Sequence, residues 1–117
     1  MNKVKEREMM REMYAEQRWL CAVKGCYKQV NQRAHILGNT KLNRHLYGDD
    51  IIDSKLNWRG VCSLECNNKI DIGKGTLLAE VAFQIMDSDE SYEDKRSLIN
   101  DLIIEKNELR EAKIENV

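Results

Sequence analysis

The fold of this chain is decided by two cysteine-containing stretches, Cys21-Ala22-Val23-Lys24-Gly25-Cys26 and Cys62-Ser63-Leu64-Glu65-Cys66. Each stretch holds one pair of cysteines, and residues 27–61 separate the pairs. Cysteines about two to four residues apart are typical of each half of a tetrahedral zinc site. Gly25 gives the first pair the backbone freedom that a tight turn requires. We therefore predict one structural Zn²⁺, with Cys21, Cys26, Cys62 and Cys66 as its ligands.

Composition indicates why such a chain gains from a metal. Of its 117 residues, 33% are charged and only 6% are aromatic, so the hydrophobic core is expected to be small. No apolar stretch approaches the ~18 residues of a membrane span, and we expect no membrane contact. The first residues are charged and no apolar signal core follows them. We expect a cytoplasmic protein, in which thiols stay reduced and four cysteines favour metal over disulfides.

We expect a single domain. Residue composition and glycine spacing divide it into three segments. Residues 1–20 are expected to form a helix, residues 21–74 a glycine-punctuated zinc module, and residues 75–117 further helices. The following elements are expected: helices over 3–20, 76–86 and 91–115, extended pieces over 30–37 and 57–64, and a short helix capped by Ser63. The predicted fold class is therefore α+β. The last helix either packs on the module or pairs with a second copy of the chain.

Charge is unevenly distributed among these segments. Residues 21–74 carry nine Lys or Arg against five Asp or Glu, a net charge of +4, whereas residues 75–117 carry a net charge of −6. The zinc module is therefore the part suited to a polyanion such as DNA. An ordinary solvated surface explains the same modest excess. The candidates for phosphate contacts are Lys41, Arg44, Arg59, Lys69 and Lys74.

Three polar residues stand at characteristic places around the second cysteine pair. His35 lies in Arg33-Ala34-His35-Ile36, Asn57 in Leu56-Asn57-Trp58, and Asn67 directly after Cys66. With the cysteines, these residues resemble the HNH endonuclease superfamily in its zinc-knuckle, ββα-metal type. The stretch 21–70 is similar in particular to phage recombination endonucleases of the NinG type and to related small phage HNH-like proteins. The resemblance implies a ββα module for this stretch and does not cover the expected N-terminal and C-terminal helices that flank it.

The resemblance also implies catalytic roles. The family's histidine on the first strand is the general base that takes a proton from the attacking water, and this role falls on His35. The middle asparagine orients the base, and this role falls on Asn57. The final His or Asn binds a catalytic divalent metal such as Mg²⁺, and this role falls on Asn67, with Asn68 as the alternative.

One position departs from the family pattern. Many members carry Asp, Glu or His directly before the base as the other metal ligand, and this chain has Ala34 there. Asp71, one turn beyond Asn67, is a candidate replacement. His45 fits no motif position and is expected in a loop.

Two functions follow as expectations, beside a third, which is a purely structural phage component built around zinc. The first is a metal-dependent DNA endonuclease of phage or prophage origin, acting in recombination or DNA processing in the cytoplasm of a bacterial host. The second is a catalytically degenerate HNH-like zinc module that binds nucleic acid, or that inhibits or assembles with a protein partner through its acidic C-terminal helix.

Overall fold

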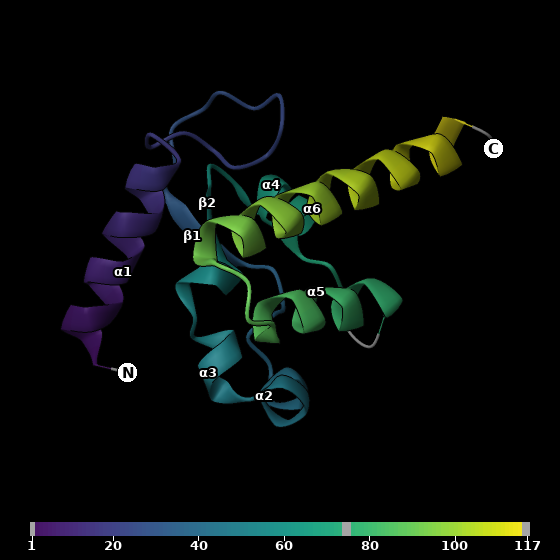
Figure 1. Cartoon of the computed structure of the whole chain (residues 1–117). Coiled ribbons are helices and arrows are strands. Elements are labelled where there is room, and N and C mark those ends of the chain that lie inside the picture. The colour runs from purple at the N-terminus through teal and green to yellow at the C-terminus, as the bar shows by residue number, and fades with distance from the viewer. Residues whose placement is uncertain (1, 74–75, 116–117) are drawn as a thin grey trace.

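The computed structural model describes residues 2–73 and 76–115, with side chains described as far as residue 110. The described residues form six α-helices, one short 3-10 helix and one two-stranded sheet (Figure 1). In chain order these are α1 (Lys3–Glu16), β1 (Gln32–His35), α2 (Lys41–Tyr47), α3 (Asp49–Ile52), the 3-10 helix η1 (Lys55–Asn57), β2 (Trp58–Val61), α4 (Leu64–Ile70), α5 (Leu77–Asp87) and α6 (Tyr92–Glu115). The predicted α+β class is confirmed.

Strands β1 and β2 form an antiparallel pair. Gln32 stands opposite Val61, and His35 stands opposite Trp58. The connection between the strands is long and contains α2, α3 and η1, which the sequence did not predict. His45 therefore lies on α2 and not in a loop. Helix α4 follows β2 almost at once, so strand, strand and helix succeed one another around the second cysteine pair.

The two faces of the sheet meet different helices. Side chains alternate along a strand, so Arg33 and His35 share one face and Ala34 lies on the other. On the first face Arg33 forms an ion pair of 2.8 Å with Glu6 of α1. On the second face Ala34 is fully buried, in a core cluster that includes Cys66 and Ile70 of α4. Helices α1 and α4 therefore cover opposite faces of the sheet.

Close packing explains the glycine in β2. A Cβ atom at Gly60 would lie 2.6 Å from Cδ1 of Tyr14 on α1. Real Cβ atoms do not approach other atoms so closely, so any side chain here would push α1 away from the strand. Gly60 therefore allows the α1 ring to rest directly on the sheet.

Helix α1 ends earlier than the sequence predicted. The helix stops at Glu16, and Arg18 and Trp19 then adopt left-handed backbone angles, with φ of 54° and 62°. Neither residue is a glycine, so composition gave no signal for this reversal. The reversal turns the chain out of α1 and into the loop that holds the first cysteine pair.

Side-chain caps fix the starts of the later helices. The hydroxyl of Ser63 accepts a hydrogen bond from the backbone N–H of Cys66, which confirms Ser63 as the cap of α4. Thr76 caps α5 in the same way, and α5 starts and ends one residue later than predicted. Thr40 caps α2. Each cap satisfies a backbone donor that the first helical turn leaves free.

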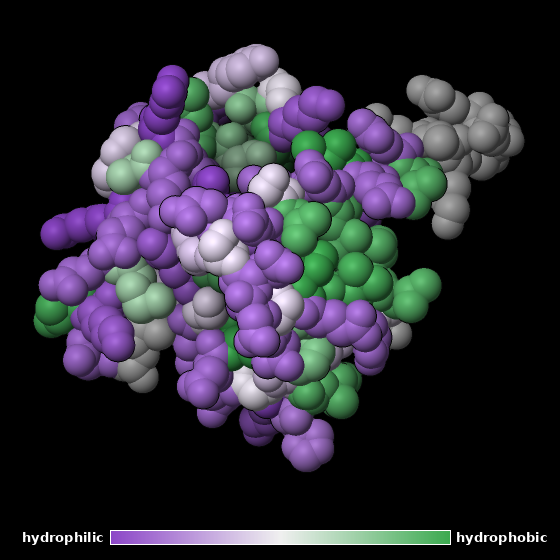
Figure 2. All heavy atoms as spheres, in the orientation of Figure 1, coloured by the Kyte–Doolittle hydropathy of each residue, from purple (hydrophilic) through white to green (hydrophobic). Residues whose placement is uncertain are grey.

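Helix α6 packs on its own chain through its N-terminal half. Ile99, Leu102 and Ile103 are buried, in a core cluster that also contains Ala82 and Met86 of α5. The C-terminal half projects past the rest of the molecule (Figure 1). In Figure 2 an apolar patch lies on the same side as this projecting half. None of the described helices has both the length and the apolarity needed to cross a bilayer.

Candidate metal centre and the cleft at His35

The four cysteines converge as predicted. Their sulfur atoms all lie within 4.8 Å of one another, and Cys62 Sγ is 3.7 Å from both Cys26 Sγ and Cys66 Sγ. A tetrahedron of sulfurs with Zn–S bonds of about 2.3 Å has edges of about 3.8 Å. A disulfide would require about 2.05 Å, and all four thiols are free. The cluster therefore fits a metal ion in a four-thiolate shell, the chemistry typical of structural zinc.

Short backbone turns hold each pair of ligands. In the first pair, the N–H of Cys26 donates to the carbonyl of Val23, and Gly25 takes a φ of 85° that permits the turn. In the second pair, Cys62 directly follows β2 and Cys66 lies in the first turn of α4. The sulfurs thus join the loop after α1 to the junction between sheet and helix.

The protein environment shifts the pKa values of two of the thiols in opposite directions. The hydroxyl of Ser63 lies 3.6 Å from Cys62 Sγ and lowers the pKa of that thiol to about 7. Burial raises the pKa of Cys21 to about 12. Since a metal binds the thiolate form, metal binding would displace protons from this cluster and weaken as the pH falls.

A separate cleft of about 290 Å³ lies at the end of β1, on the face covered by α1. Its lining residues are Glu6, Arg33, His35, Asn39, Arg44, Asp53 and Trp58. The guanidinium of Arg33 stacks 4.4 Å from the ring centre of Trp58, and the His35 ring meets the same indole edge-on at 6.3 Å. Burial, together with the positive charges of Arg33 and Arg44, lowers the pKa of His35 to about 4. His35 is therefore neutral at pH 7 and able to accept a proton.

Asn57 holds the chain that leaves His35. Its Oδ1 accepts from the backbone N–H of Leu37 at 2.7 Å, and its Nδ2 donates to the carbonyls of Leu37 and Ile52. The side chain is fully buried. These bonds tie the segment after β1 to the end of α3, so Asn57 fixes the backbone beside His35 without facing the cleft.

The structure does not bring Asn67 and Asp71 to His35. Both belong to α4 or its C-terminal cap, on the opposite face of the sheet, and no α4 residue lines the cleft. Asp71 instead accepts a hydrogen bond from the N–H of Gly73. Ala34 faces α4 and is fully buried. Within the described residues, no trio of His, Cys, Asp or Glu outside the four cysteines is placed to hold an ion. The residues around His35 do not fit a catalytic divalent metal.

The predicted phosphate contacts are dispersed. Lys41 is exposed on α2. Arg44 is engaged by Asp53, Asp49 and Asn39 at 2.8–3.1 Å. Arg59 is only 2% exposed, so it does not belong to the outer surface. Lys69 lies on α4 beside a second cavity. Lys74 lies outside the described residues.

Several residues of the cleft were absent from the sequence prediction. Strand alternation alone indicated that Arg33 shares a face with His35. Glu6 and Asp53 come from distant segments, so the sequence held no signal for them. Chemically, the molecule offers a four-thiolate metal site and, apart from it, a neutral imidazole between two guanidinium groups. Comparison of the chain with family models, curated proteins and solved structures gives no match in any of the three.

Proposed function

We propose that this chain is an HNH-like nuclease module in which zinc holds the fold and His35 acts on a DNA phosphodiester. The observation that carries the proposal is the pair of hydrogen bonds between Asn57 and the backbone N–H and carbonyl of Leu37. An HNH-type site needs an asparagine that fixes the backbone beside the base. Asn57 makes that connection from a distant point in the chain.

The order of elements supports the same proposal. One cysteine pair precedes β1, and the other spans the junction of β2 and α4. This is the arrangement that the resemblance implies for a zinc-knuckle ββα module. A closed shell of four thiolates leaves no open coordination position, so the zinc is assigned a structural role.

His35 is assigned the role of general base. Its neutral imidazole would take a proton from the water that attacks phosphorus. The bond from phosphorus to one sugar oxygen would break, and that oxygen would take a proton from solvent. An incoming phosphate would raise the pKa of His35 toward a more effective value. The Arg33 guanidinium, once exchanged from Glu6 to phosphate, would stabilise the negative charge that develops on the phosphoryl oxygens. No step is assigned to a second metal, since no three His, Cys, Asp or Glu side chains among the described residues of the cleft lie close enough together to hold one.

A second candidate function keeps the architecture and loses the catalysis. Buried Ala34 and the position of Asn67 behind the sheet favour it, because both remove ligands that an HNH-type metal requires. In this case the module binds nucleic acid, or assembles with a protein partner through α6. Either function would place the chain in phage or prophage DNA processing within a bacterial cytoplasm.

Nicking of supercoiled plasmid separates the two candidates. Zinc-loaded protein is incubated with plasmid and Mg²⁺, Mn²⁺ or Ni²⁺, beside a His35→Ala variant and a control His45→Ala variant. The nuclease proposal expects nicking by the wild type and the control, and loss of nicking in His35→Ala. Plasmid retained at low salt but never nicked supports the binding module. If the plasmid is neither nicked nor retained, the result contradicts both nucleic-acid functions.

A further inference from the structure

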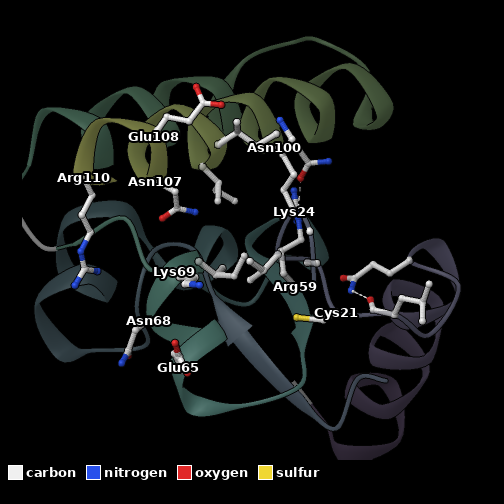
Figure 3. A pocket seen from close by; sticks show the side chains of 18 of the residues that line it. Cys21, Lys24, Arg59, Glu65, Asn68, Lys69, Asn100, Asn107, Glu108 and Arg110 are labelled. Atoms are coloured by element: carbon white, nitrogen blue, oxygen red, sulfur yellow. Dashed lines mark hydrogen bonds between the residues drawn. The ribbon is translucent and has the colours of Figure 1, made fainter. Parts of the chain in front are cut away.

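A larger cavity, of about 890 Å³, lies between the first cysteine stretch, α4 and α6 (Figure 3). It is distinct from the cleft at His35. Arg59 stands opposite Ala34 in the sheet. Its side chain therefore lies on the same face as Ala34, which is the face opposite to His35. The volume is in the range of small-molecule sites, about 300–1,000 Å³. The proposed nuclease chemistry uses none of the residues that line this cavity.

Arg59 contributes a buried positive charge to the cavity wall. Its Nε donates to Asn100 Oδ1 of α6 at 3.0 Å, and its Nη1 donates to the carbonyls of Leu56 and Trp58. Its Nη2 is buried and has no hydrogen-bond partner among the described residues. None of the ion pairs in the described part of the chain includes Arg59. Among the described residues, no direct ion pair neutralises this buried guanidinium, which is costly at such a position.

Further cations surround Arg59. Lys24, Lys69, Arg96 and Arg110 also line the cavity, against the carboxylates of Glu65 and Glu108. Figure 3 shows Lys69 and Arg110 on opposite walls, from α4 and α6. Arg110 belongs to the C-terminal segment, residues 75–117, whose net charge is −6. The cavity therefore gathers positive side chains even from a segment that is acidic as a whole. With five cationic side chains against two carboxylates, the lining carries a net positive charge of 3, and a concave site with such an excess attracts anions.

Part of the cavity wall is apolar. Val23, Ile70, Ile103 and Ile104 line it beside the cations. A fully hydrated inorganic ion would make no apolar contact with these side chains. The pairing of an apolar wall with a positive end fits an organic body that carries a terminal anionic group.

We propose that this cavity binds a terminal phosphate monoester, with its dianion in the field of Arg59, Lys69 and Arg110 and its organic body against the apolar wall. A monoester is favoured over a backbone diester because Arg59 is recessed. A phosphate flanked by two sugars would be held at the surface, whereas an end group can enter. Two sources carry this chemistry, a free mononucleotide and the 5′-phosphorylated end of a nucleic acid.

Calorimetric titration of the zinc-loaded full chain tests the proposal. The probes are AMP, adenosine, and a short oligothymidylate with and without a 5′-phosphate. We expect a phosphorylated probe to bind at least about tenfold more tightly than its unphosphorylated partner, since charge-assisted contacts are the strong ones. If only the oligonucleotide shows this preference, the source is a nucleic-acid end. If AMP shows it, a free nucleotide suffices.

Matched variants locate the binding. Lys69→Gln and Arg110→Gln each remove one charge near the surface of the cavity and are expected to weaken the phosphorylated probe at least about threefold. Lys3→Gln makes the same change at an exposed position of α1 that lines neither cavity, and it is expected to leave binding unchanged. Equal binding of phosphorylated and unphosphorylated probes, absence of saturable binding, or insensitivity to both Lys69→Gln and Arg110→Gln overturns the proposal. The result is independent of whether the chain nicks DNA.

Discussion

The side-chain amide of Gln17 pairs with the backbone of Gly60 as a neighbouring strand would. Gln17 Nε2 donates to the Gly60 carbonyl at 2.9 Å, and the Gly60 N–H donates to Gln17 Oε1 at 2.8 Å. Strand β2 has β1 on one side only, so its other edge carries backbone groups that need partners. Gln17 bonds both groups of Gly60 just after α1 ends, beside the Ala22 N–H that also donates to the Gly60 carbonyl, and so joins the N-terminal helix to the sheet.

Replacing Gln17 with Ala is expected to destabilise the zinc-loaded chain by about 1–2 kcal/mol, because the Gly60 N–H loses its partner at a half-buried edge, while the Gly60 carbonyl keeps the Ala22 N–H. Urea unfolding followed by circular dichroism measures the change. Gln84→Ala, at an exposed position of α5, is the control and is expected to stay within about 0.5 kcal/mol of wild type. Equal unfolding midpoints for the two variants would show that the edge contact contributes little.

Replacing Asn57 with Ala is expected to cost about 3 kcal/mol or more. The N–H and the carbonyl of Leu37 would lose buried partners together, and the side-chain space would be left unfilled. Thermal unfolding measures the loss. Asn31→Ala, at an exposed position before β1, serves as the matched control. If Asn57→Ala and the control have the same melting temperature, Asn57 does not fix the backbone beside His35. The argument for His35 then loses its support.

Metal analysis is expected to find about one zinc per chain. Strong chelation should lower the melting temperature, and added zinc should restore it, because the ion would join the loop after α1 to the junction between β2 and α4. Cys62→Ser is expected to weaken zinc binding by more than about 100-fold, since even outer-shell changes cost about 10–100-fold. Cobalt substitution gives an independent readout, a thiolate-to-metal charge-transfer band. A chain that melts identically with and without metal would refute the structural role.

His35 is expected to make the chain acid-sensitive. Its pKa is about 4 in the folded chain and about 6.5 when unfolded, so the unfolded state binds more protons between these values. Stability contributed by neutral His35 is present above about pH 6.5 and is lost as the pH falls toward 4. Glu6, Arg33, Arg44 and Asp53 face His35 across the cleft and set this balance.

The measurement is stability between pH 7 and 4.5 for the wild type and for His35→Asn. Thiolate protonation affects both proteins, so the difference between them isolates the histidine. We expect the wild type to lose on the order of 1–2 kcal/mol more than the variant. His45→Asn, at an exposed site on α2, should follow the wild type. A wild-type imidazole that titrates near pH 6.5 by NMR would contradict the expectation.

The sequence was most informative where chemistry depends on local spacing. The cysteine pairs predicted their own cluster, and Ser63 predicted the start of α4, because ligand spacing and capping act over a few residues. The sequence was least informative between β1 and β2. There α2 and α3 are short, and their apolar residues are too few to show a helical period.

Long-range placement accounts for the remaining differences. Arg59 was predicted as a candidate phosphate contact, whereas its place opposite Ala34 in the sheet directs its side chain inward to Asn100 of α6. Asn67 and His35 both fit their motif positions, yet they lie on opposite faces of the sheet. Motif spacing specifies the elements on which such residues lie, and the pleat of the strand decides which face each one meets.

The long connection between β1 and β2 has a consequence for how the chain folds. The two strands must find each other across residues 36–57, and closing a loop of this length costs entropy before any strand contact can repay it. The cysteine pairs flank the same strands, so a bound ion would close that loop at the outset. We expect zinc supply during synthesis to set the rate at which the sheet forms, with metal-starved chains collapsing slowly and exposing the edge of β2.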